Sequence, residues 1–479
     1  MKRLLSIIIL GLIGHVQLKA QGIIVEDTVV LQLGYNEIDS IIVLNGLPSG
    51  FLPINYAVAV HRVVYETPNY DGSTTTASGL IMIPEIDTIC SMPMMAYLHG
   101  TKVKKVQTFY YLRDEWQLGV IAATSGYAMV MPDYIGLGNS PGIHLYQHAQ
   151  TEASASIDIL RVCRSICQQE NKHLNGQLFI MGYSQGGHAV LATHRMIQEE
   201  LNGEFTVTAS APGSGPYDMS GSQLDMVASF DPYAVPGYLP FLIQSYQHIY
   251  GNLYDSIQQI YVPPYDQILE PLLQGDHDMW EVNQVMPAVP RDIIQPDYAD
   301  AFFSDNTHPA YLALKDNDVY EWIPEAPMLY NYCRSDEEVT YLNTVVASQY
   351  MSGGGAPDIE VVERDTALGH FECAQPSIFL SKLWFDGMAE FCEGNVGVGE
   401  IDVTDDIKPY PNPVSGDFVQ FGNDEPISVR VMDIRGKELV PESNVNTNGR
   451  LNIKDIPPSV VLVEIRVRDS VGYKRLVIQ

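Results

Sequence analysis

Hydrophobic positions along the chain follow two successive patterns. Between residues 56 and 84 apolar and polar positions alternate, which predicts paired strands at 57–64 and 76–83. Farther along, short and wholly apolar runs alternate with stretches of helical pattern. The apolar runs are 94–98, 127–131 and 178–181, and the helical stretches include 151–167 and 188–201. Because such runs suit strands buried on both faces, the alternation predicts an α/β fold with a mainly parallel sheet.

A long segment then interrupts this alternation. After a short strand predicted at 205–209, residues from about 219 to 310 are rich in Tyr, Pro and Leu and have no strand–helix period. We interpret this segment as a cap inserted over the carboxyl edge of the sheet, where the sites of such folds collect. The alternation resumes with strands at 327–332 and 359–362 and ends in an amphipathic helix at about 375–388.

The N-terminus has the pattern of an export signal. Lys2 and Arg3 precede an apolar run at 4–13 that is too short to span a bilayer, and Ala20 ends a plausible cleavage site. Residues 1–20 are therefore predicted to be a signal peptide. No later segment has the pattern of a transmembrane helix.

The C-terminus forms a separate unit in this interpretation. Residues 395–405 have the composition of a linker, and 406–479 predict a small all-β domain. Its strands are expected at 427–432, 460–467 and 475–479. The α/β domain then spans 21–394.

Charge narrows the classes of partner. The formal net charge is −31, which argues against nucleic acid as a partner and disfavours binding to anionic membrane surfaces.

Export permits disulfides, and six cysteines are present, which allow about fifteen pairings. Cys163 and Cys167 lie on one predicted helix at a spacing unfavourable for a disulfide. Cys and His are too scattered to predict a metal site.

One motif carries the chemistry. Residues 182–186 read Gly-Tyr-Ser-Gln-Gly, and an apolar strand precedes them while a helix of small residues follows. This G-x-S-x-G element alone recurs by chance, but in this context it predicts the strained strand-to-helix turn that exposes a nucleophile in α/β-hydrolase folds. Ser184 is therefore the predicted nucleophile.

A catalytic serine needs a base, which follows it in the chain order of this fold. Only His370 lies past the last predicted sheet strand. The remaining histidines after the serine lie on the next helix, or in or beside the cap; they are His188, His194, His248, His277 and His308.

The acid that orients the base should end the preceding strand. Asp336 is our choice, with Glu337 and Glu338 as alternatives because the register of a loop is not fixed by sequence. Asp133 and Asp218 follow other strands, and we interpret them as turn or helix caps.

The oxyanion of the tetrahedral intermediate needs backbone N–H donors. We expect one from Gln185, next to the nucleophile, and one from Thr101, in the turn after the third strand. Gly100 would allow close approach, and His99 would brace the turn. This mechanism requires no metal and no organic cofactor.

Two cysteines flank the predicted acid and base. Cys333 and Cys373 each lie three residues from Asp336 or His370. If those loops meet, a disulfide between them is a hypothesis, with unpaired neighbouring thiols as the alternative.

Several motifs together resemble secreted lipases and esterases of the secretory-lipase type. They are 132–138 (PDYIGLG), 182–188 (GYSQGGH), 335–339 (SDEEV) and 369–370 (GH). The resemblance spans about 56–388 and implies an α/β-hydrolase core with a helical cap and a Ser184, Asp336, His370 triad. The family often has proline where Thr340 stands here.

The tail resembles the C-terminal sorting domain of type IX secretion. The matching parts are 410–413 (YPNP), a Gly-containing turn and 474–478 (KRLVI), although Ser459 and Val460 stand where glycine is common. The resemblance implies a secretion machinery as partner and export across the outer membrane, followed by release or surface attachment. The alternative is an accessory β-domain that binds carbohydrate or packs on the enzyme.

The expected function is that of a secreted serine hydrolase cleaving carboxylic esters, small or lipidic, through an acyl-enzyme. The aromatic and apolar cap suits an apolar acyl pocket. A serine peptidase of the same fold, aminopeptidase-like, is the alternative. A surface binding protein on a disabled hydrolase scaffold is the third possibility, but it would have no need of a complete triad.

Overall fold

The computed structural model describes most of the chain. The described residues are 22–45, 52–86, 89–392, 407–412, 414–422, 426–432, 438–447, 449–457, 459–467 and 470–478. The predicted signal peptide at 1–20 and linker at 395–405 lie outside them.

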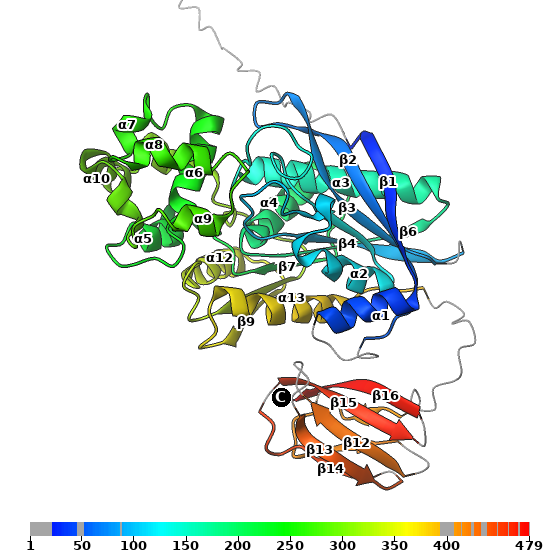
Figure 1. Ribbon diagram of the computed structural model, residues 1–479. Coiled ribbons are helices and arrows are strands. Elements are labelled where there is room, and N and C mark those ends of the chain that lie inside the picture. The colour runs from blue at the N-terminus through cyan, green and yellow to red at the C-terminus, as the bar shows by residue number, and fades with distance from the viewer. Residues whose placement is uncertain are drawn as a thin grey trace, which may run out of the picture.

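A nine-stranded mixed sheet forms the centre of the first domain (Figure 1). Its order is β1-β2-β3-β5-β4-β6-β7-β8-β9. The first three strands and the β3–β5 pair are antiparallel, and every pair from β5 to β9 is parallel. The strands are β1 Ile24–Leu33, β2 Val58–Pro68, β3 Thr74–Pro84, β4 Ser91–Leu98, β5 Ala128–Pro132, β6 His173–Tyr183, β7 Ala209–Gly213, β8 Met328–Cys333 and β9 Ile359–Asp365. The predicted α/β fold with a mainly parallel sheet is confirmed.

Helices bury both faces of this sheet. Helices α3 (Ala149–Gln169) and α4 (Gln185–Glu200) share one apolar cluster with alternate residues of β4, including Met94 and Ala96. The intervening Met95 and Tyr97 belong to a second cluster on the other face. That cluster includes α1 (Tyr35–Leu44), α2 (Gln117–Thr124) and α13 (His370–Asp386). Alternate side chains thus enter opposite cores, which explains the continuous apolar runs.

The cap connects β7 to β8 and lies off one end of the sheet, in green in Figure 1. A π-helical turn at Met219–Gln223 opens it. The helices that follow are α5 Leu224–Val227, α6 Tyr238–Tyr250, α7 Ile257–Ile260, α8 Tyr265–Leu272, α9 Met279–Asn283, α10 Pro296–Ser304 and α11 Pro309–Asp316. Helical structure therefore extends a few residues past the expected end at about 310. A further helix, α12 Leu342–Gly353, separates β8 from β9.

The C-terminal region is an all-β unit with a core of its own. One small sheet has the order β10-β11-β14 and a second β13-β12-β15-β16. Their bounds are β10 Pro409–Tyr410, β11 Phe418–Phe421, β12 Ile427–Met432, β13 Glu438–Val445, β14 Arg450–Asn452, β15 Ser459–Val467 and β16 Ser470–Ile478. Apolar residues of both sheets, such as Val419 and Val463, form one buried cluster. The predicted all-β region is confirmed.

Two disulfides join distant parts of the first domain. They are Cys333–Cys373 and Cys90–Cys392, and Cys163 and Cys167 are buried free thiols. The hypothesis of a Cys333–Cys373 bond thus agrees with the structure, in which it joins the end of β8 to α13. Among the described residues, no helix combines the length and the apolar character needed to cross a bilayer.

Candidate active site

Ser184 occupies a strained turn between β6 and α4. Its backbone has φ 59° and ψ −124°, a conformation that non-glycine residues rarely adopt. A Cβ on Gly186 would lie 1.9 Å from the carbonyl oxygen of Leu98, so only glycine allows the helix to start this close to β4. The turn holds the serine side chain at the carboxyl end of the parallel strands.

Asp336 and His370 meet at the same edge of the sheet. Asp336 follows β8, and His370 begins α13 just after β9. His370 Nδ1 lies 2.7 Å from Asp336 Oδ2, and both side chains are buried. Asp336 Oδ1 accepts the N–H groups of Glu338 at 3.0 Å and Val339 at 2.8 Å. The carboxylate is thereby fixed, and it favours the tautomer with the proton on Nδ1, which leaves His370 Nε2 unprotonated.

The two alternative acids do not contact the imidazole. Glu337 Oε2 accepts the backbone N–H of His370 at 3.0 Å, and Glu338 Oε2 accepts the hydroxyl of Tyr238 at 2.8 Å. Geometry therefore favours Asp336 as the partner of the ring.

Opposing influences set the pKa of His370. Burial alone would lower it, because the charged imidazolium loses its hydration. The hydrogen bond and charge of Asp336, with the charges of Glu338 and Glu337, outweigh burial and raise the pKa above its ordinary value of 6.5.

Tyr183 connects the strand end that carries Ser184 to the predicted base. Its hydroxyl donates to the backbone oxygen of His370 at 2.8 Å, and the two rings lie 5.0 Å apart. Within the described part of the chain, no hydrogen bond joins Ser184 Oγ to His370. Catalytic hydrogen bonds often form fully only with substrate in place.

The predicted oxyanion donors border the serine. A Cβ on Gly100 would lie 3.5 Å from Ser184 Cβ, which places the turn that carries Thr101 beside the nucleophile. In the described structure, the N–H groups of Gln185 and Thr101 make no hydrogen bond. The ring of His99 contacts the backbone oxygens of Gly100 at 2.6 Å and Asp133 at 3.1 Å, as expected of a brace.

A buried polar network behind the turn escaped the sequence analysis. Glu152 on α3 accepts the side chain of Gln185 and Nδ1 of His188, both at 2.7 Å. His188 Nε2 donates to the backbone oxygen of Asn317, just beyond α11, at 2.9 Å. Burial would lower the pKa of His188, but the charge and hydrogen bond of Glu152 outweigh burial and raise it. The contact between Glu152 and His188 joins the helix after Ser184 to both α3 and the end of the cap.

The other acids singled out earlier have structural contacts. Asp133 accepts the Ser78 hydroxyl at 2.7 Å and the N–H of Phe109 at 2.9 Å, and Asp218 accepts the N–H of Ser222 at 2.7 Å. These contacts match the turn-capping and helix-capping interpretations.

A cavity beside Ser184 runs under the cap. Its apolar lining includes Met219, Leu224, Val227, Leu239, Leu242, Phe302, Leu314 and Val339. Its polar lining includes Tyr146, Gln147, Gln223, Tyr233, Tyr238 and Glu338. The lining surface is mostly apolar.

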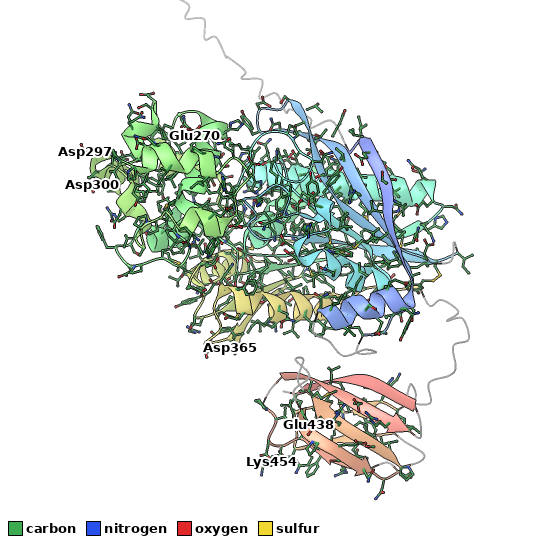
Figure 2. All side chains as sticks on the ribbon, viewed as in Figure 1. Glu270, Asp297, Asp300, Asp365, Glu438 and Lys454 are labelled. Carbon is green, nitrogen blue, oxygen red and sulfur yellow. A yellow bond between two sulfur atoms is a disulfide. The ribbon has the colours of Figure 1, made fainter. Side chains whose placement is uncertain are left out.

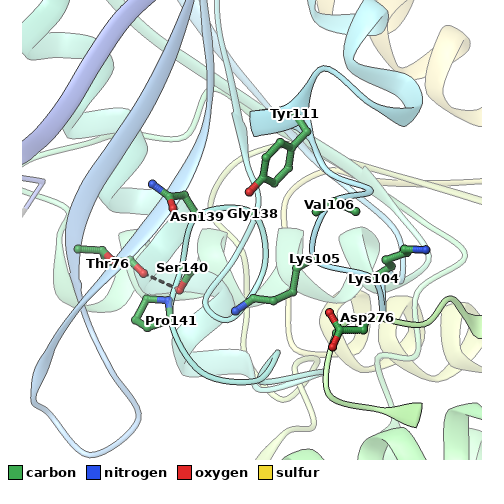
Figure 3. Close-up of a pocket in the computed structure, with 11 residues that line it drawn as sticks. Thr76, Lys104, Lys105, Val106, Tyr111, Gly138, Asn139, Ser140, Pro141 and Asp276 are labelled. Carbon is green, nitrogen blue, oxygen red and sulfur yellow. Dashed lines mark hydrogen bonds between the residues drawn. The ribbon is translucent and has the colours of Figure 1, made fainter. Parts of the chain in front are cut away.

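A larger hollow of about 610 Å³ lies elsewhere (Figure 3). It is lined by Thr76, Lys104, Lys105, Val106, Tyr111, Gly138, Asn139, Ser140, Pro141, Gly275 and Asp276. Neither Ser184, Asp336 nor His370 contributes to it. The hollow is therefore not the candidate reaction site.

Comparisons with protein families give two matches. The model of the family described as secretory lipase matches residues 104–378. The model of the secretion system C-terminal sorting domain matches residues 408–479. No curated protein sequence matches the chain.

Solved structures share the fold of the first domain. A ligand-bound form of the rice cell wall degrading esterase LipA from Xanthomonas oryzae is 29% identical, with TM-score 0.67, over 76% of this chain and 96% of that one. A hydrolase from Legionella pneumophila is 24% identical, with TM-score 0.70, over 76% and 97% of the chains. Candida antarctica lipase A in its closed state is 15% identical, with TM-score 0.59, over 78% and 84%.

Proposed function

The chain belongs to the secretory lipase family and hydrolyses esters, and we propose that it does so through an acyl-enzyme on Ser184. The observation that carries this proposal is the 2.7 Å contact between His370 and Asp336 at the sheet edge where the strained serine turn lies. His370 Nε2 takes the proton of Ser184 Oγ, which attacks the ester carbonyl. Asp336 orients the imidazole and stabilises its protonated form.

The N–H groups of Gln185 and Thr101 donate hydrogen bonds to the carbonyl oxygen and stabilise the negative charge that develops on it. Collapse of the intermediate breaks the bond to the alcohol, which leaves with the proton held by His370. A water molecule, deprotonated in turn by His370, then attacks the acyl-enzyme. The bond between the acyl group and Ser184 Oγ breaks, Ser184 takes the proton back from His370, and the carboxylic acid is released. Every step uses groups of this chain, the substrate and water.

The substrate class follows from the cavity beside Ser184. Its apolar lining suits carboxylic esters with an apolar acyl group, lipids included. One of the similar structures, at 29% identity, is a rice cell wall degrading esterase, which supports ester over peptide substrates.

The C-terminal sorting domain supports secretion by the type IX route. We propose that residues 1–20 carry the chain across the inner membrane and that the region from 406 onward directs it across the outer membrane. The mature enzyme then acts outside the cell, either released or held at the surface.

A fluorophosphonate probe and a substrate panel test the reaction. The full-length protein should be labelled, Ser184→Ala should not, and p-nitrophenyl esters should be cleaved much faster than aminoacyl anilides. Labelling that persists in Ser184→Ala would refute the nucleophile. Faster cleavage of the anilides would instead favour the peptidase.

A further inference from the structure

One acidic residue lines the cavity beside the nucleophile. Among the described lining residues, Glu338 is the only one with a carboxyl or basic side chain, and the cap contributes mainly apolar side chains and tyrosines. Since a lone carboxylate in a mostly apolar pocket is costly, its presence there calls for a partner. We propose that Glu338 determines specificity by accepting a hydrogen bond from a hydroxyl or ammonium group of the ester substrate.

Contacts from two sides fix this carboxylate in place. Tyr238 donates to Oε2 at 2.8 Å, while Tyr233 donates to the backbone oxygen of Glu338 at 2.6 Å and Gln223 to the same atom at 3.0 Å. The backbone N–H of Glu338 donates to Asp336 at 3.0 Å. The cap and the acid loop therefore hold the group in one position, which reduces the entropy lost when a ligand binds.

The second carboxylate oxygen is available to a ligand. Oε1 of Glu338 has no hydrogen-bond partner in the described structure, although the side chain is only partly exposed. Burial, together with the charges of Asp336 and Glu337, raises the pKa of this carboxyl, although His370 and the Tyr238 hydroxyl act in the opposite direction. A donor on the substrate would stabilise the charged form, and an ammonium group would add an opposite charge.

Glu338 also acts electrostatically on the predicted base. The charge of Glu338 contributes to the raised pKa of His370, although the Glu338 side chain makes no hydrogen bond to the ring in the described structure. An effect through His370 would change the hydrolysis of every ester by the same factor. A role in recognition, by contrast, changes the ratio between substrates with and without a donor.

The experiment rests on the proposed ester hydrolysis and compares matched esters on the full-length protein. One series is propyl butyrate, glyceryl monobutyrate and aminopropyl butyrate, and the other is propyl hexanoate with its ω-hydroxy and ω-amino analogues. Rates are followed by titration of released acid for wild type, Glu338→Gln and Glu338→Leu. The control is Glu270→Gln, an exposed carboxylate on α8 (Figure 2).

In at least one of the two series, the donor group of the substrate is expected to reach Glu338. In that series, Glu338→Leu should lower kcat/KM for the hydroxyl and amino esters roughly tenfold relative to the ester without a donor. Glu338→Gln keeps an acceptor but not the charge, so it should affect the ammonium ester far more than the hydroxyl ester. Glu270→Gln should leave all ratios unchanged.

Unchanged ratios in both series, with plain esters still hydrolysed, would overturn the role of Glu338 alone. An equal loss for all esters would also overturn it and assign Glu338 to support of His370. Absence of hydrolysis of any ester by the wild type would instead refute the proposed function.

Discussion

His370 carries the clearest prediction at the scale of single residues. The neutral imidazole is the base, so kcat/KM should fall as the pH falls through the pKa of His370. Because burial is outweighed by Asp336 and the neighbouring glutamates, that pKa lies above 6.5, and the acid limb should too. Asp336→Asn should move the limb to lower pH and lower kcat by roughly ten-thousandfold. The pH dependence of p-nitrophenyl butyrate hydrolysis measures both effects. Near-normal activity in Asp336→Asn, with loss in Glu337→Gln, would transfer the role to the neighbour.

A second residue-scale prediction concerns the contact between Glu152 and His188 behind the serine turn. Glu152 contacts the side chain of Gln185, whose N–H is a predicted oxyanion donor. Glu152→Gln should therefore lower kcat roughly tenfold with little change in KM, because the loss acts on the transition state. Steady-state kinetics on one p-nitrophenyl ester provide the test. Glu204→Gln, which breaks a pair with Arg161 on the same α3 helix, should reduce thermal stability but not kcat. A rise in KM alone would contradict the positioning role.

These two sets of residues differ in how far sequence could reveal them. Ser184, Asp336 and His370 could be named as candidates because each follows a recognisable strand and the fold fixes their chain order. The contact between Glu152 and His188 depends on how α3 rotates against α4. The sequence does not specify that rotation. The partner of a polar residue on a buried helix face therefore could not be predicted from the sequence.

At the scale of elements, the strands were predictable where they were apolar. β7 is the exception: it runs over Ala209–Gly213, whereas the pattern predicted 205–209. Phe205 and Val207 are buried but lie outside the strand, and their apolar side chains led to the prediction at 205–209. The strand itself consists of small residues because α4 begins directly against it. A Cβ on Gly187 would lie 2.6 Å from the oxygen of Gly213. The edge strand β1 was missed because its apolar and polar residues do not alternate with burial: Val25 and Val29 are exposed, and its pairing with β2 is interrupted by irregularities.

The disulfides supply the element-scale prediction. Cys333–Cys373 joins the end of β8 to α13 across 40 residues, next to both Asp336 and His370. Replacing both cysteines by serine should lower the free energy of unfolding by up to about 4 kcal/mol and also lower kcat, because the acid and base loops lose their link. Thermal unfolding and ester kinetics measure the two effects. Serine at Cys90 and Cys392 should lower stability without changing kcat. Equal kinetic losses in both variants would show that the effect is not local.

At the scale of the whole molecule, the net negative charge lies in the part of the chain before the C-terminal region, because residues 406–479 contain ten Lys and Arg and ten Asp and Glu. Exposed carboxylates on the cap include Glu270, Asp297 and Asp300 (Figure 2). Asp365, at the end of β9, and Glu438, in the C-terminal region, are exposed as well. Like charges of this density repel anionic surfaces and other copies of the chain. An extracellular ester hydrolase with this surface is suited to soluble or neutral substrates more than to anionic lipid layers.

Independent cores lead to the last prediction. Of the described residues, the apolar cluster of the C-terminal unit contains only those from 407 onward, and the cavity beside Ser184 is lined only by those before 340. A chain ending at residue 394 keeps Cys392 and its disulfide. It should therefore hydrolyse p-nitrophenyl butyrate with the kcat/KM of the full-length enzyme. In the native host, however, its activity should remain in the periplasm, because the sorting domain is absent. Fractionation of cells and medium measures the location, and full-length Ser184→Ala, followed by antibody, should still be exported. Export of the shortened chain would contradict the sorting role, and loss of activity in the purified shortened enzyme would contradict the independence of the two units.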